Sequence, residues 1–174
     1  SFLFFSVFFV YNERSFMYNV VKESGRKWEM KFFGTYYHSL DAKGRLVVPA
    51  RFRETLKDLK TLYILQGFDG AISVYPEEAY HQELSFLEAQ NFKNADARAY
   101  IRTIYASIEE LEVDAAGRIT LPVRIQKKYD IGQKVIVIGV GDHLEIWDEE
   151  RYLSYERDAC GNLEDLAAKL QEKA

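Results

Sequence analysis

Two segments of the chain carry the same chemically active residues at the same spacing. The first, from Asp41 to Arg51, reads Asp-Ala-Lys-Gly-Arg-Leu-Val-Val-Pro-Ala-Arg. The second begins 73 residues later, from Asp114 to Arg124, and reads Asp-Ala-Ala-Gly-Arg-Ile-Thr-Leu-Pro-Val-Arg. An aspartate, an alanine, a glycine, a proline and two arginines recur at identical offsets. This repetition indicates a tandem duplication in which each half of the chain is one copy of a small unit.

The arginines of these segments are suited to binding an anionic polymer. Guanidinium groups neutralise phosphates and release counterions, and arginine can also donate two hydrogen bonds to a guanine edge. Although the whole chain has a net charge of −4, both segments have a local excess of positive charge. We therefore predict a DNA-binding surface made of these residues: Lys43, Arg45, Arg51, Arg53, Arg118 and Arg124. We expect the first copy to make the main contact, because Ala116 replaces Lys43 in the second copy.

Four residues of the two segments are expected to shape the turns rather than to bind DNA. They are Asp41, Gly44, Asp114 and Gly117. An aspartate can close an Asx turn, and glycine accepts a positive φ. Each aspartate could also pair with the arginine four residues later, so contact with DNA and pairing within the turn are both open roles for that arginine.

Composition excludes several classes of protein. At 174 residues, with 48% hydrophobic and 29% charged residues, the chain is typical of a soluble globular protein. Its one cysteine, Cys160, excludes an intramolecular disulfide and fits a reducing compartment. No zinc motif, phosphate-binding loop, dinucleotide fingerprint or nucleophile–histidine arrangement is evident. We therefore expect no enzyme activity, no catalytic residue, no metal and no cofactor.

The first 29 residues differ from the rest. Residues 1–10 are almost entirely aromatic and aliphatic, but they are too few to cross a bilayer as a helix and they lack the features of a signal peptide. We expect residues 1–29 to be a translated leader or the result of a mis-set start, with Met30 as the true start. The alternative is an amphipathic arm that touches a membrane; the main interpretation includes no membrane partner.

Local patterns predict the same series of elements in each copy. In the first copy, residues 32–40 and 45–48 are expected to form a hairpin around the turn, Pro49 to open a short helix with Phe52, Leu56 and Leu59 on one face, and residues 61–65 and 71–75 to be strands. In the second copy, the corresponding strands are predicted at 111–113, 118–121, 134–140 and 144–147, with a helix after Pro122.

Helices are predicted between and after the copies. Residues 77–108 have helical spacing, with a break at 91–94 where Asn94 is a plausible N-cap. Residues 149–173 are expected to form one or two helices with an apolar stripe of Leu163, Leu166 and Leu170. One copy of about 45 residues can hardly bury a core alone. The two copies are therefore expected to pack together, and exposed strand edges or the tail to recruit further subunits.

From Met30 to Trp147 the chain closely resembles the MraZ family of bacterial transcriptional regulators. The matching residues include Gly34-x-Tyr36-x-His38-x-Leu40-Asp41-Ala42-Lys43-Gly44-Arg45-Leu46-x-x-Pro49-Ala50-x-Phe52-Arg53, Asp96-Ala97-Arg98, Glu112-x-Asp114-x-x-Gly117-Arg118-Ile119-x-x-Pro122 and Val137-Ile138-Gly139-Val140-x-Asp142-His143-Leu144-Glu145-Ile146-Trp147. The resemblance implies an α+β fold, mostly β with packed helices. Its core would be a tandem duplicated AbrB-like swapped-hairpin, or double-psi barrel-like, β unit with intervening and C-terminal helices.

The resemblance also implies boundaries and a function. We expect one AbrB-like repeat at 34–80, a helical connector at 81–109, a second repeat at 110–153 and a helical tail at 154–174. A protein similar to this family would be a sequence-specific regulator that assembles into a ring and binds repeated double-stranded DNA boxes upstream of the cell-division and cell-wall gene cluster, including its own gene. It would be cytoplasmic and associated with the nucleoid.

An alternative function is an oligomeric assembly scaffold that acts through protein partners without reading DNA. The dependence on salt separates the two functions. Affinity for duplex DNA falls steeply as salt is added, whereas a hydrophobic interface between proteins is far less sensitive.

Overall fold

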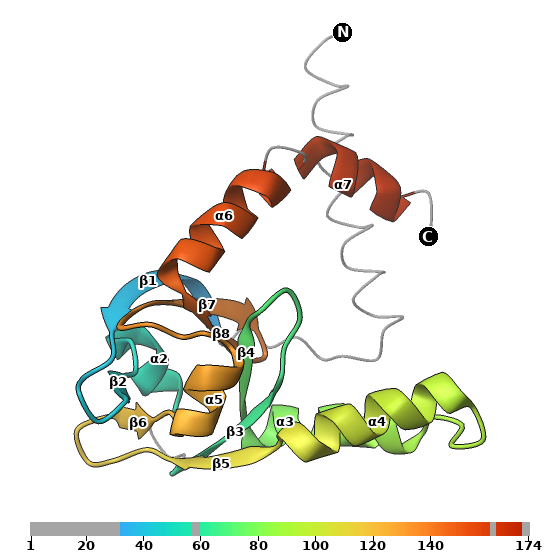
Figure 1. Ribbon diagram of the computed structural model, residues 1–174, viewed down its shortest axis with the longest axis horizontal. Coiled ribbons are helices and arrows are strands. Elements are labelled where there is room, and N and C mark those ends of the chain that lie inside the picture. Colours follow the sequence, from blue (N-terminus) through green and yellow to red (C-terminus); the bar gives the residue numbers. More distant parts are fainter. Residues whose placement is uncertain (1–31, 57–59, 161–162, 172–174) are drawn as a thin grey trace, which may run out of the picture. The chain divides into compact units, whose positions relative to one another are not determined.

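The computed structural model describes residues 32–56, 60–160 and 163–171 (Figure 1). The predicted leader at 1–29, the predicted helix position Leu59 and the predicted interruption at 161–162 lie outside these residues. The strands are β1 Phe32–Ser39, β2 Arg45–Val47, β3 Thr61–Gln66, β4 Ile72–Pro76, β5 Glu109–Glu112, β6 Arg118–Thr120, β7 Lys134–Gly141 and β8 Leu144–Asp148. The helices are α2 Ala50–Thr55, α3 Glu77–Glu88, α4 Ala95–Ser107, α5 Val123–Lys128, α6 Glu149–Cys160 and α7 Leu163–Gln171.

The main sheet combines strands of both copies in a palindromic order. Its order is β1-β7-β8-β4-β3-β5, and every neighbouring pair is antiparallel. The first strand of each copy therefore lies against the third strand of the other copy: β1 pairs with β7, and β5 pairs with β3. This exchange is the swapped arrangement expected from the resemblance, and it confirms the α+β class with a duplicated β unit.

The predicted hairpin between residues 32–40 and 45–48 is wrong. Strand β1 follows β7 along its whole length, from Phe32 opposite Gly141 to Ser39 opposite Lys134. Strand β2 instead pairs with β6. The turn at 41–44 therefore carries the chain from the sheet to a separate two-stranded ribbon, instead of folding β2 back onto β1.

The ribbon of β2 and β6 is symmetric about its centre. Leu46 lies opposite Ile119, Arg45 lies opposite Thr120 and Val47 lies opposite Arg118. The loop before each strand bonds to the chain leaving the other strand: Val48 N donates to Gly117 O over 3.0 Å, and Leu121 N donates to Gly44 O over 2.9 Å. The two turns are thus fixed at opposite ends of one ribbon.

The main hydrophobic core lies between the sheet, the ribbon and the two short helices α2 and α5. Its side chains come from both copies, and Phe52 of α2 and Ile125 of α5 occupy equivalent places in it. Phe52 packs edge-on against the rings of Phe32 and Tyr36. Figure 1 shows α2 and α5 beside the ribbon. Both helices are therefore buried against one core that the two copies share.

The helical hairpin of α3 and α4 packs against β3 and β4 through a second core built around Leu65, Leu87 and Ile104. The side chain of Asn94 accepts from the backbone N–H groups of Asp96 and Ala97, which confirms the predicted N-cap. The second core and the main hydrophobic core lie on opposite faces of the sheet, because alternate residues of β3 point to opposite faces.

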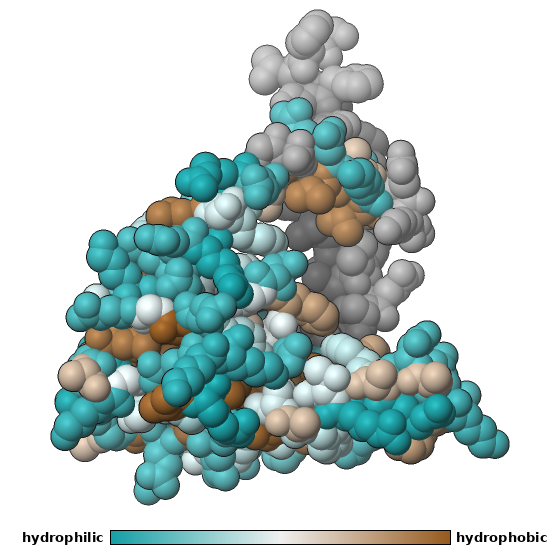
Figure 2. Space-filling model, viewed as in Figure 1, coloured by the Kyte–Doolittle hydropathy of each residue, from teal (hydrophilic) through white to brown (hydrophobic). Residues whose placement is uncertain are grey.

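The C-terminal helices differ in how they are held. Tyr152 and Tyr155 of α6 pack against Trp147 of β8. In contrast, α7 has no buried residue, and Leu163, Leu166 and Leu170 are all exposed (Figure 2). No helix in the described ranges is long and apolar enough to span a membrane.

Candidate nucleic-acid interface

The first loop, Asp41 to Arg45, is organised by the Asp41 carboxylate. Oδ1 accepts from the backbone N–H groups of Lys43 and Arg45 over 2.8 and 3.0 Å, which makes the predicted Asx turn. Oδ2 accepts from the Nε of Arg45 over 2.6 Å. A backbone bond from Gly44 N to Asp41 O closes the turn. The aspartate therefore fixes both the backbone and the direction of the arginine.

The second loop, Asp114 to Arg118, has the same geometry. Asp114 accepts from the backbone N–H groups of Ala116 and Arg118 over 2.9 and 3.0 Å, and from Arg118 Nε over 2.7 Å. Gly44 and Gly117 share a φ of +72°, which is the left-handed region that glycine enters without steric cost. Two five-residue sequences that differ only at Lys43 and Ala116 thus build the same loop twice.

Hydrogen bonding keeps both aspartates ionised. The pKa of Asp41 is lowered from 3.8 to about 2, first by the backbone N–H of Arg45 and further by the Arg45 side chain and the Lys43 N–H. The pKa of Asp114 is lowered in the same way, first by the backbone N–H of Arg118 and then by its side chain. At neutral pH each arginine therefore faces a permanent negative charge on one edge.

The opposite edge of each arginine remains available. Arg45 and Arg118 contact their aspartates through Nε, and among the described residues their terminal nitrogens have no partner. Their side chains are 33% and 34% exposed, respectively. The structure therefore shows the pairing within the turn and leaves the terminal N–H groups of each arginine available to a phosphate or a guanine edge.

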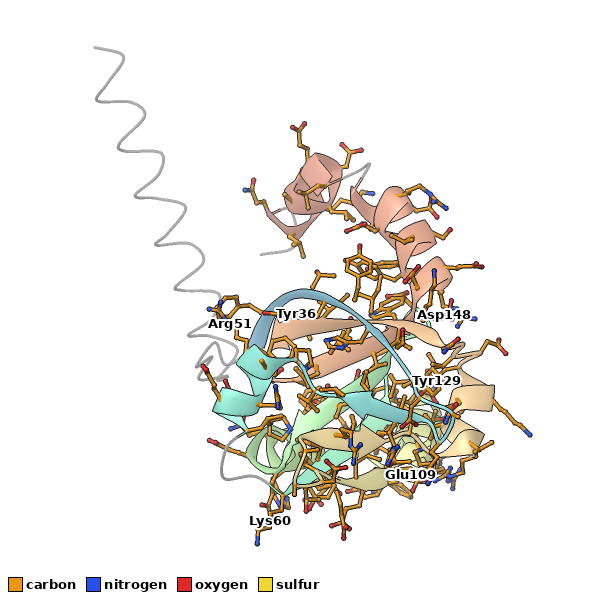
Figure 3. The ribbon with its side chains drawn as sticks, turned by 90° about the vertical axis from the view of Figure 1, so that its left-hand side faces the viewer. Tyr36, Arg51, Lys60, Glu109, Tyr129 and Asp148 are labelled. Atoms are coloured by element: carbon orange, nitrogen blue, oxygen red, sulfur yellow. The ribbon has the colours of Figure 1, made fainter. Side chains whose placement is uncertain are left out.

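The second arginine of each repeated segment is occupied by a partner within the chain. The Arg51 guanidinium lies 3.8 Å above the Phe33 ring, and Figure 3 shows Arg51 well apart from Glu109. Arg124 instead forms an ion pair with Glu109 through its terminal Nη2. The repeated arginines thus have different surroundings in the two copies.

The remaining two candidates, Lys43 and Arg53, lie in different places. Lys43 is exposed in the first loop. Arg53 lies on α2 of the first copy, but its side chain passes over Gly117 of the second loop. Of the six predicted residues, Lys43 and Arg45 therefore lie at the first loop and Arg53 and Arg118 at the second, whereas Arg51 and Arg124 contact Phe33 and Glu109.

Gln126 was not predicted and belongs to this surface. It lies over Gly44, and its Nε2 donates to Leu121 O over 2.7 Å. A shallow groove of about 400 Å³ beside the first loop is lined by residues that include Asp41, Ala42, Gln126 and Ile131. The sequence could have identified Gln126 by its position, because Gln126 in the second copy is equivalent to Arg53 in the first.

The arrangement offers hydrogen-bond donors and positive charge rather than reactive groups. In the part of the chain that the structure describes, no three histidine, cysteine, aspartate or glutamate side chains gather as metal ligands would. The two loops, with equal backbone geometry and arginines presented alike, could bind two equivalent segments of an anionic polymer.

Comparison with known proteins shows similarity in sequence along the whole described region. The sequence model of the MraZ protein family matches twice, at residues 31–103 and 104–173. A protein of Lactiplantibacillus plantarum named "Transcriptional regulator MraZ" is 37% identical over 139 residues, which cover 80% of this chain and 97% of that protein. A protein of the same name from Heliobacterium modesticaldum is 39% identical, over 80% of this chain and 96% of that protein. Another from Mesoplasma florum is 34% identical, over 82% of this chain and 97% of that protein.

Proposed function

The chain belongs to the MraZ family, and we propose that it is a transcriptional regulator that binds double-stranded DNA through its first and second loops. One observation carries this proposal: two loops at opposite ends of one ribbon hold Arg45 and Arg118 in the same geometry, with terminal nitrogens that have no partner among the described residues. The relatives' name, which describes a regulator of transcription, supports it independently.

The physical mechanism is electrostatic attraction with local reading of bases. Cations at the loops displace counterions from the phosphates, which gives affinity that falls with salt. An arginine whose terminal nitrogens enter the major groove can donate to guanine and so add preference for a sequence. The aspartate contributes by holding the guanidinium in one orientation, which reduces the side-chain entropy lost on binding.

The DNA targets that we propose are repeated boxes upstream of the cell-division and cell-wall gene cluster, including the protein's own gene. This would place the protein in the cytoplasm, on the nucleoid. A duplicated protein with two equivalent loops suits DNA in which short boxes recur, because each additional loop that engages raises the overall affinity.

We further propose that the protein assembles into a closed homo-oligomeric ring. Phe33 and Tyr37 on the edge strand β1 are 43% and 62% exposed, and Leu163 and Leu170 on α7 are 66% and 71% exposed. Exposed apolar residues on an element commonly mark an interface between subunits, and a closed ring would cover strand edges. Light scattering at micromolar concentration should give several times the 20.3 kDa mass of one chain.

A footprint on the DNA directly upstream of the protein's own gene tests the proposed function. We expect protection of short, regularly spaced segments, lost when an excess of the same duplex is added but retained with unrelated duplex. Absence of protection at low salt, where binding to phosphates is strongest, would favour the scaffold alternative.

A further inference from the structure

We propose that each DNA-binding loop is completed by the helix of the other copy, so that Arg53 of the first copy serves the second loop. This inference rests on the proposed function, and it assigns a residue that the order of the sequence places elsewhere. Arg53 follows the first loop by eight positions along the chain, yet it does not lie over that loop.

The contact that carries the inference is between Arg53 and Gly117. A Cβ atom placed on Gly117 would meet the Arg53 side chain, with Nη1 at 3.3 Å and Cγ at 3.5 Å. The backbone explains this position. Val48 N donates to Gly117 O, and α2 begins two residues later with Arg53 N bonded to Pro49 O. The swapped ribbon thus brings the start of α2 to the second loop.

The first loop receives the equivalent contact from the second copy. A Cβ atom on Gly44 would meet the carboxamide of Gln126. Gln126 occupies the same position in α5 as Arg53 does in α2. Leu121 N donates to Gly44 O, and Gln126 N bonds to Pro122 O. The same backbone geometry therefore places a neutral side chain over the first loop and a cation over the second.

The two substitutions between the copies compensate each other. The first loop has Lys43 but receives the neutral Gln126, whereas the second loop has the neutral Ala116 but receives Arg53. These positions therefore give each loop an aspartate, an arginine held by that aspartate and a further cation, which is Lys43 at the first loop and Arg53 at the second. On this proposal the second loop contributes to DNA binding about as much as the first, whereas the sequence alone favoured the first copy as the main contact.

A charge-exchange experiment tests this assignment with the full chain and the upstream duplex. Arg53→Gln gives α2 the residue that α5 already has at the equivalent position, so it should fold. We expect R53Q and K43A each to weaken binding several-fold, and each to lower the salt slope by about one, as loss of one phosphate contact does. Adding A116K to R53Q should return both values to those of the wild type, because it restores a cation to the second loop.

A matched pair of double variants locates Arg53. If Arg53 acts with the second loop, R53Q should reduce affinity for the duplex less in an R118A background, where that loop no longer engages the DNA. In an R45A background, R53Q should reduce affinity by its full amount. The opposite pattern, or an R53Q variant with wild-type affinity and salt slope, would overturn the inference while leaving the proposed function intact. The proposed function itself fails in a different way, namely if R45A and R118A both leave binding unchanged.

Discussion

Leu46 lies directly opposite Ile119 in the ribbon of β2 and β6, and the 73 positions between them equal the offset between the two repeated segments. Each residue is therefore paired with its own equivalent in the other copy. This places the pseudo-twofold axis of the duplicated unit between these two side chains. The equal geometry of the two loops follows from that symmetry, since each loop leads into one strand of the ribbon.

Replacement of Leu46 by alanine should destabilise both copies together. Its side chain is 1% exposed, as is that of Ile119, and truncation of such a side chain costs about 2–5 kcal/mol. Because the two residues are direct cross-strand neighbours, L46A and I119A combined should cost less than their sum, by about 0.5–3 kcal/mol. Urea unfolding at fixed protein concentration measures these values. V47A, at a 43% exposed position of the same strand, is the control. If the free-energy losses of L46A and I119A simply add in the double variant, the two residues do not share one packing site.

Alanine at Gly44 or Gly117 should destabilise the protein more than alanine at Gly132. Both loop glycines have a φ of +72°, where a side chain costs about 1–2 kcal/mol. In addition, the new methyl group would displace Gln126 or Arg53 from the opposite copy. Gly132 lacks this left-handed φ and faces one flexible carboxylate. Thermal unfolding of the three variants tests this, and we expect lower unfolding midpoints for the variants at Gly44 and Gly117 than for the variant at Gly132. Equal midpoints would show that a side chain does not strain the loops.

The contribution of Asp41 to stability should be lost in acid. The folded pKa of about 2 lies below the ordinary value of 3.8, so the contribution is fully present above pH 4 and disappears as the pH falls through about 2. The variant D41N keeps an acceptor for the turn but has no charge to titrate. The stability difference between wild type and D41N should therefore shrink between pH 5 and pH 2, measured by urea unfolding. A difference that stays constant over this range would contradict the observed bonding.

Arg124 should matter less for DNA binding than Arg118. Arg124 uses its terminal Nη2 to pair with Glu109, whereas Arg118 pairs through Nε and keeps its terminal nitrogens for a ligand. We expect R124A to reduce affinity less than R118A, and E109Q to raise affinity by releasing Arg124 and removing a negative charge. Titration of a labelled duplex by fluorescence anisotropy compares the three variants. A loss with R124A as large as that with R118A would place Arg124 in the primary contact.

Local sequence predicted most elements but not their partners. The turn at Asp41, the cap at Asn94 and the helix after Pro122 were correct, because hydrogen bonds and dihedral preferences between neighbours determine them. The hairpin joining 32–40 to 45–48 was wrong, because which strand pairs with which depends on contacts far apart in the chain. The position of Arg53 could not be predicted for the same reason. The swap between copies, and not the order of the sequence, determines that Arg53 lies over the second loop.

The affinity of wild type and of the R45A/R118A double variant for the upstream duplex, measured between about 50 and 200 mM salt, tests the central claim most directly. The account predicts a steep salt dependence for wild type. The folded double variant should lose at least about tenfold in affinity, with a slope lower by about two for the two lost cations. Circular dichroism confirms its fold. A folded double variant with the affinity and slope of wild type would contradict the assignment of the two loops as the DNA-binding surface.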